Sequence, residues 1–148
     1  MNFRDELQKR ILIGEGAMGT LLYTTGVDTC FEELNIINPE LVKDIHRAYI
    51  RAGADIIQTN TYGANHFKLK RYGLENQVST INRKAVKIAK EVATDNTFVF
   101  GTIGATRGLR NSDISLEEIQ RAFREQLFSL LIENPDGIFQ KICHSHQK

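Results

Sequence analysis

The chain has 148 residues, of which 41% are hydrophobic and 25% are charged, and its formal net charge is +1. These values are typical of one ordinary globular domain, and the scattered Lys and Arg residues give no electrostatic reason to expect nucleic acid as a partner. The N-terminal residues MNFRDELQKR lack the apolar stretch of a secretory signal, and no segment approaches the roughly 20 apolar residues of a membrane span. We therefore expect a cytoplasmic protein with no membrane or nucleic-acid partner.

Four short apolar runs predict β-strands, and their first residues lie 43, 43 and 40 residues apart. Runs of this kind are typical of strands that are buried on both faces, as in a parallel sheet. The runs are Ile11–Ile13, Ala54–Gln58, Thr97–Ile103 and Gly137–Phe139.

The segments between these runs have apolar residues at helical spacing. Helices are predicted over Pro39–Ala52 and Gly73–Ala93. A third helix opens at the capping box Ser115–Glu118, has Leu116 among its inward residues, and ends at Asn134–Pro135.

Alternating strands and helices predict a parallel sheet with right-handed crossovers. A (β/α)8 barrel needs eight such units, and at about 40 residues per unit it would need about 320 residues, roughly twice the present length. We therefore expect an α/β fold that is a truncated (β/α)8 TIM barrel of about three and a half βα units, over residues 1–138.

The last ten residues, 139–148, read FQKICHSHQK and differ in character from the rest. They bring Gln140 and Lys141 into a strand that should be buried. We interpret them as an aberrant polar tail that follows a truncation or a change of reading frame. A polar tail on a complete small domain is the alternative.

The first predicted strand ends in Gly14–Gly19, which matches the dinucleotide-binding pattern G-x-G-x-x-G. That pattern requires a long helix and an acid about 20 residues further on, and the sequence offers neither. We favour a tight loop in which a small ligand lies against backbone N–H groups. Glu15 would then project into the mouth of the barrel, where a carboxylate suits a substrate ammonium group. A solvated loop acid is the alternative.

Amides and hydroxyls also end the next two predicted strands, at Gln58–Thr61 and at Gly101–Thr106. The carboxyl ends of neighbouring parallel strands are where α/β folds bind ligands, so these groups favour a hydrogen-bonding floor for a substrate. The alternative is that they only cap loops and helix ends.

Three other residues or tracts invite a functional interpretation. The tract Cys143–His146 is typical of metal binding, but residues so close in sequence do not easily form a tetrahedral site, and we interpret it as an incidental tail. We predict that His46 is a surface residue of its helix. We predict that Cys30 is a small loop hydrophobe rather than a nucleophile.

The combined motifs closely resemble the homocysteine S-methyltransferase family of zinc-dependent barrels. The resemblance extends over about residues 11–138 and is carried by GEGAMGT, FEELNI, HRAYIRAGADIIQTNT and FGTIGATRG, at Gly14–Thr20, Phe31–Ile36, His46–Thr61 and Phe100–Gly108. Two departures stand out. Glu15 occupies the position of a family Asp, and Gln140–Ile142 does not reproduce a family Glu at the end of the fourth strand.

The resemblance implies methyl transfer to the thiol of homocysteine, which gives methionine. It implies zinc in the complete enzyme, held by three cysteines beyond Lys148, and it leaves the methyl donor open between a methyl-folate and an S-methyl compound. It also implies a substrate site. The predicted substrate-binding residues are Glu15, Gly16, Thr20, Asn60, Thr61 and Gly104.

Three interpretations follow from the expected half barrel. The chain is a methyltransferase fragment, inactive alone and complemented by a separate second half, or an inactive remnant that self-associates, or, less favoured, a small nucleotide-binding module. Exposed sheet edges would promote association. We also expect Ile13, Ile57 and either Val99 or Phe100 to lose packing partners inside the barrel.

Overall fold

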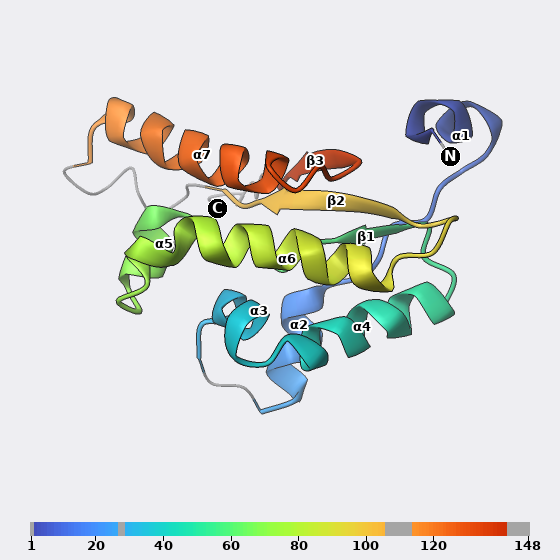
Figure 1. The fold of residues 1–148 in the computed structure, drawn as a ribbon, viewed down its shortest axis with the longest axis horizontal. Helices are drawn as coiled ribbons and strands as arrows, with labels where there is room; N and C mark the ends of the chain where they lie inside the picture. Colours follow the sequence, from blue (N-terminus) through green and yellow to red (C-terminus); the bar gives the residue numbers. More distant parts are fainter. Residues whose placement is uncertain (1, 27–28, 106–113, 142–148) are drawn as a thin grey trace, which may run out of the picture.

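The computed structural model describes residues 2–26, 29–105 and 114–141. Within these residues three parallel strands form one sheet in the order β1-β2-β3, with β2 in the centre (Figure 1). Their register places Ile57 beside Val99 and Gly101 beside Ile138. The strands are β1 (Ile56–Gln58), β2 (Phe98–Ile103) and β3 (Gly137–Gln140).

Helices precede and connect these strands, as the α/β pattern predicts. Asn38 and Pro39 begin α4, because the Asn38 side chain accepts a hydrogen bond from the backbone N–H of Leu41 and proline fits the first helical turn. The helices are α1 (Phe3–Lys9), α2 (Met18–Thr24), α3 (Leu34–Ile37), α4 (Pro39–Arg51), α5 (His66–Lys70), α6 (Val78–Val92) and α7 (Leu116–Leu131), with 3-10 turns η1 (Phe31–Glu33) and η2 (Glu75–Gln77).

The predicted capping box of α7 is confirmed. The Ser115 hydroxyl accepts from the backbone N–H of Glu118, and the Glu118 carboxylate accepts from the backbone N–H of Ser115. The helix ends before Asn134, whose φ of 56° breaks the helical path. Leu116, however, is 70% exposed and not inward as predicted, because it lies in the first turn, beyond the part of α7 that packs on the sheet.

The predicted strand Ile11–Ile13 is wrong as a strand. Only one bridge forms there, between Gly14 and Ile56. The reason is local: the Asp55 carboxylate accepts the hydrogen bond of the Ile13 N–H at 2.9 Å, so that group does not enter a ladder. Ile11 and Ile13 are 89% and 60% exposed, since nothing among the described residues packs on their outer side.

The two faces of the sheet are covered differently. Ile57 and Val99 are buried on the face toward α4 and α6, against Ile50, Ala89 and Val92. Further along the same face, Ile138 and Ile103 pack against Leu127 and Leu130 of α7. Helix α7 runs beside α6 along the sheet (Figure 1). The helices therefore form one outer layer, as the outer ring of helices does in a barrel.

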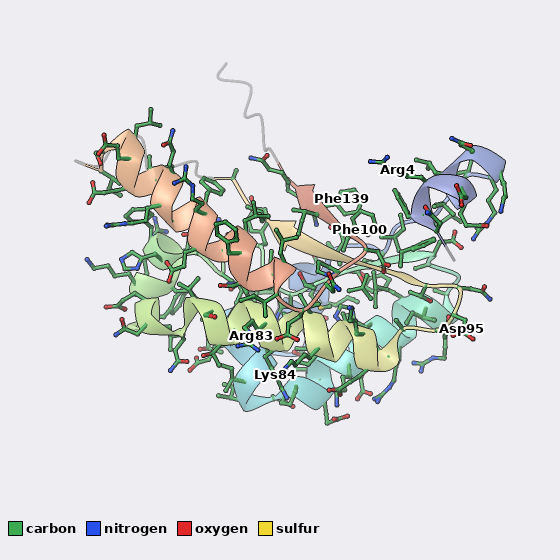
Figure 2. The ribbon with its side chains drawn as sticks, turned by 45° about the horizontal axis from the view of Figure 1, so that its top comes forward. Arg4, Arg83, Lys84, Asp95, Phe100 and Phe139 are labelled. Atoms are coloured by element: carbon green, nitrogen blue, oxygen red, sulfur yellow. The ribbon has the colours of Figure 1, made fainter. Side chains whose placement is uncertain are left out.

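The opposite face corresponds to a barrel interior, and α1 covers part of it. The Phe3 ring meets Phe98 and Phe100 edge-on, with centroids 5.2 and 4.9 Å away. Phe139 from β3 lies 4.6 Å from Phe100 between ring centroids, and Figure 2 shows the two side by side. The expected loss of packing partners is confirmed for Ile13, which is 60% exposed, but it is wrong for Ile57 and for both Val99 and Phe100. Helices α4 and α6 bury Ile57 and Val99, and aromatic rings bury Phe100.

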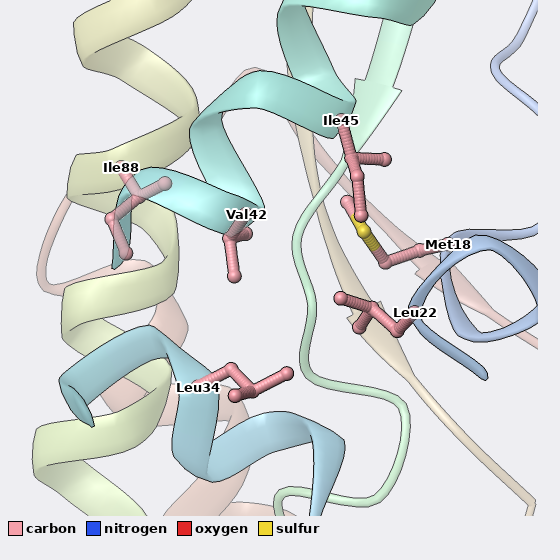
Figure 3. Close-up of a cluster of buried hydrophobic side chains, with 6 residues drawn as sticks. All are labelled: Met18, Leu22, Leu34, Val42, Ile45 and Ile88. Atoms are coloured by element: carbon pink, nitrogen blue, oxygen red, sulfur yellow. The ribbon is translucent and has the colours of Figure 1, made fainter. Parts of the chain in front are cut away.

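A separate core joins α2 and α3 to α4 and α6. Figure 3 shows it between the helices, and its packing fixes α2, and so the loop before it, against α4. Its six buried residues are Met18, Leu22, Leu34, Val42, Ile45 and Ile88.

The C-terminal strand continues through Gln140, past residue 138, and the backbone N–H of Lys141 donates to Ile103 at 2.9 Å. The expected polar tail is otherwise outside the described residues, as are Cys143–His146. Of the helices in the described part of the chain, none has the length and apolar character needed to cross a membrane.

The role of α1 as a cover can be tested by removing its aromatic side chain. Phe3→Ala should lower the free energy of unfolding by about 2–3 kcal/mol, because it removes two aromatic contacts and exposes part of Phe98 and Phe100. Leu7→Ala is the matched control, since Leu7 is on the same helix but 55% exposed. Urea denaturation measures both variants, and equal losses would show that α1 does not cover this face.

Candidate functional site

A cavity of about 300 Å³ opens at the carboxyl ends of β1 and β2. It is the place where parallel α/β sheets bind ligands. Four of the six predicted site residues line it: Glu15, Thr20, Asn60 and Thr61. The remaining lining residues are Ala17, Met18, Gly19, Phe31, Glu32, Gln58, Thr59, Tyr62, Thr102 and Lys141.

Both the main chain and the side chain of Glu15 make contacts that fix its position in the cavity lining. Its backbone N–H donates to the carbonyl of Ile56 at 2.9 Å, which ties the loop to the end of β1. Its carboxylate lies 3.3 Å from Nδ1 of His46, and the Glu15 side chain is only 1% exposed. Glu15 is thus a buried carboxylate at the cavity and not a solvated loop acid.

The prediction that His46 is a surface residue is wrong, because its side chain is completely buried. Val42, Ile45, His46 and Tyr49 follow the i, i+3, i+4, i+7 spacing that gives one helix face. That face of α4 packs against α2 and the loop before it. This helical spacing is the sequence signal that could have predicted the burial of His46. It places the imidazole on the buried face of α4 although the side chain is polar.

Gly16 is not in the cavity lining, and its place is explained by Tyr49. A side-chain carbon at position 16 would lie 2.8 Å from the Tyr49 hydroxyl oxygen, too close for any larger residue without movement. The pKa of Tyr49 is raised by burial and, second, by the negative charge of Glu15. Tyr49 therefore packs against the loop immediately beside the carboxylate.

The polar groups of Asn60 and Thr61 serve the loop itself. The Thr61 hydroxyl donates to the Thr102 carbonyl at 2.6 Å and lies 2.7 Å from the Thr59 hydroxyl. The Asn60 amide donates to the Phe31 carbonyl at 2.6 Å. Both side chains therefore bond within the protein, as in the alternative that they only cap loops and helix ends. They contribute to the shape of the cavity more than they provide free hydrogen-bonding groups for a ligand.

Helices α6 and α7 also donate hydrogen bonds to the loop that carries Asn60 and Thr61. The buried Gln126 amide of α7 donates to the Thr61 carbonyl at 2.7 Å. The buried Asn82 amide of α6 donates to the Ala64 carbonyl, also at 2.7 Å. Buried polar side chains that are bonded in this way fix a loop in one position.

Two further lining residues have buried oxygen atoms without a partner among the described residues, Gln58 Oε1 and Thr102 Oγ1. Both belong to strand ends that the sequence marked as polar, although neither was among the six predicted site residues. Buried polar atoms are usually paired, so these two oxygen atoms are lining groups that still have hydrogen-bonding capacity for a ligand.

Gly104 does not line the cavity but packs behind it. A side chain there would overlap the backbone oxygen and the ring of Tyr62. Its small size therefore permits the chain after β2 to pass close to the loop that carries Asn60 and Thr61.

Cys30 behaves as the small buried hydrophobe that the sequence predicts. It is 2% exposed, and burial together with the neighbouring Glu32 charge raises the pKa of its thiol to about 11. A thiol with so high a pKa is a poor nucleophile and a poor metal ligand.

The described residues do not fit a zinc site. They contain no group of three His, Cys, Asp or Glu side chains placed to hold a metal ion. The zinc cysteines that the resemblance puts beyond Lys148 stay a prediction.

The sheet, its outer helices and this cavity define part of an α/β barrel with a ligand site at the carboxyl ends of its strands. A family model for homocysteine S-methyltransferase matches residues 12–147. The chain belongs to the homocysteine S-methyltransferase family, and the predicted resemblance is confirmed.

Known relatives agree with this assignment. The chain is 30% identical to a methionine synthase of Mycobacterium tuberculosis (strain ATCC 25618 / H37Rv) and 29% identical to one of Mycobacterium leprae (strain TN). Each comparison covers 94% of this chain and 13% of the relative. The chain thus spans about an eighth of the length of these methionine synthases.

Solved structures show the same fold. The crystal structure of the Escherichia coli homocysteine methyltransferase MmuM in its oxidized form has a TM-score of 0.73 and 26% identity, covering 89% of this chain and 53% of that one. The metallated form has a TM-score of 0.78 and 24% identity, covering 93% and 56%. The α/β fold is therefore similar to part of a homocysteine methyltransferase barrel.

The packing role of Gly104 gives a direct test. Gly104→Ala should lower the free energy of unfolding by about 1–3 kcal/mol, because the added carbon displaces Tyr62. Gly14→Ala is the matched control, since nothing lies within 4 Å of a side-chain carbon there. Thermal unfolding compares the two, and a Gly104→Ala chain as stable as the control would contradict this packing.

Proposed function

We propose that this chain supplies the amino-acid-binding part of a methyltransferase that acts on homocysteine. The observation that carries the proposal is the buried Glu15 carboxylate in the lining of the cavity. An α-amino acid carries an ammonium group, and a charge-assisted hydrogen bond to a carboxylate is about twice as strong as a neutral one. Family membership supports homocysteine as that amino acid.

The proposed reaction transfers a methyl group to the homocysteine sulfur. The sulfur must lose its proton, because a thiol with a pKa of about 8.5 is mostly protonated at neutral pH and the thiolate is the nucleophile. The thiolate then forms a bond to the methyl carbon, and the electron pair of the broken bond leaves with the donor. Methionine is the product, and the donor is a methyl-folate or an S-methyl compound.

The residues described here contribute binding and orientation. Holding the amino-acid part of the substrate fixes the position of the sulfur, which lowers the entropy cost of the reaction. We propose that the group that activates the thiol, zinc bound by cysteines, is supplied by residues outside the 148 residues, and that the chain by itself is inactive.

An apolar surface on α7 supports a packing partner for this chain. Phe128 is 61% exposed, and Ile132, at the end of the same helix, is 60% exposed. Strand β3, which follows α7, is an edge strand of the sheet formed by the described residues. We propose that further barrel units cover this surface, from a complementing chain or, for this polypeptide alone, from a second copy.

The association can be measured by sedimentation velocity. The 148-residue chain should sediment as larger species as its concentration rises, because association buries apolar surface. Replacing Phe128 and Ile132 by Ser should reduce the association, whereas Leu7→Ser, an exposed position on α1, should not. A chain that remains monomeric at every concentration would refute self-association.

The role of Glu15 can be tested in the enzyme complemented with the remaining barrel units. Glu15→Ala should raise the KM for homocysteine about 10–150-fold, as expected for losing about 1.5–3 kcal/mol from a hydrogen bond to a charged group. The KM for the methyl donor should change little.

Two further variants make this test specific. Glu15→Gln keeps the shape and removes the charge, and it should also raise the homocysteine KM. Glu117→Ala removes an exposed acid in the first turn of α7 and should leave that KM unchanged. An unchanged homocysteine KM in both Glu15 variants would refute the ammonium site.

A further inference from the structure

We propose that His46 is a positioning residue for the ammonium site, whose Nδ1–H holds the Glu15 carboxylate toward the substrate. The inference rests on the proposed function of Glu15 and adds a second residue, one that does not line the cavity. It concerns how the carboxylate is oriented and not whether it binds.

The chemistry of a carboxylate, and not the distance, assigns the direction of the hydrogen bond between the two side chains. His46 Nδ1 and Glu15 Oε2 are 3.3 Å apart, and the two side chains are 0% and 1% exposed. An ionised carboxylate only accepts hydrogen bonds, so the shared hydrogen belongs to Nδ1. The distance is at the long end for such a bond, as is common before a ligand closes a site.

The other ring nitrogen shows that His46 is not explained by packing. His46 Nε2 is buried and has no partner among the described residues. A buried polar atom without a partner costs stability, and an apolar side chain of similar size would avoid that cost beside Val42 and Ile45. The arrangement is therefore best explained by the one hydrogen bond that the imidazole makes within the described part of the chain, with Glu15.

The neighbouring residues restrict the carboxylate further. Tyr49 lies on the same face of α4 as His46, one turn along, and packs against Gly16. The backbone of Glu15 is bonded to Ile56 of β1. The loop is thus fixed on both sides of residue 15, and the remaining freedom is rotation of the Glu15 side chain, which the Nδ1–H restrains.

Two variants, His46→Asn and His46→Gln, distinguish a hydrogen bond from Nδ1 to Glu15 from a role of His46 in packing alone. The side-chain N of Asn can occupy the position of Nδ1, whereas the side-chain N of Gln lies nearer to that of Nε2. The probes are L-homocysteine and 4-sulfanylbutanoate, which has the same thiol and carboxylate but no amine. Calorimetric titration of the full 148-residue chain measures the affinity for each.

His46→Gln should weaken L-homocysteine binding about tenfold or more, the loss expected for a hydrogen bond to a charged group. His46→Asn should stay within about threefold of the unchanged chain. Neither variant should alter the affinity for 4-sulfanylbutanoate. Thermal unfolding should show similar losses for the two variants, since both bury an amide at the same position.

The outcomes separate the two proposals. If the unchanged chain does not prefer L-homocysteine over 4-sulfanylbutanoate, the ammonium site itself is refuted. If it does prefer L-homocysteine but the Asn and Gln variants bind it equally, the positioning role is refuted. Nitrogen NMR of the imidazole provides a measurement without substitution: we expect hydrogen on Nδ1 of His46, and hydrogen on Nε2 alone would overturn the inference.

Discussion

Backbone hydrogen bonds between the segment Ile13–Glu15 and the start of β1 are the constraint on which the rest of the site depends. Ile13 accepts from Asp55 and Ile56 at 2.8 and 3.1 Å, and Glu15 donates to Ile56 at 2.9 Å. They bring residues more than 40 positions apart in sequence into register. Without them neither the buried position of Glu15 nor its approach to α4 would follow, because the loop has three glycines in six residues and little stiffness of its own.

The elements with local signals were predictable from the sequence. Proline at the start of α4 and the capping box of α7 act within a single turn, and both helices begin there. The segment Ile11–Ile13 was not predictable, because the Asp55 side chain takes its N–H in competition with a strand ladder. The polarity of His46 predicts an exposed residue, but its place on an apolar helix face decides the outcome and buries it.

The candidate site shows a similar division. Sequence located the strand ends, and four of the six predicted residues line one cavity there. It did not show which polar groups are already bonded, because that depends on helices far along the chain: Gln126 reaches Thr61 across 65 positions. The hydroxyls and amides that looked available are mostly used to build the loop, and the buried carboxylate of Glu15 is left as the charged group that α4 holds in place.

The position of α1 has a consequence for how this domain can be joined to other polypeptides. The contact of Phe3 with Phe98 holds α1 beside the start of β2 (Figure 1). The cavity is lined by residues at the opposite, carboxyl ends of β1 and β2. A tag, a linker or another domain attached ahead of Asn2 would therefore leave on the side away from the cavity. Such an attachment would not obstruct substrate entry, and the amino terminus is the suitable end for immobilisation or labelling.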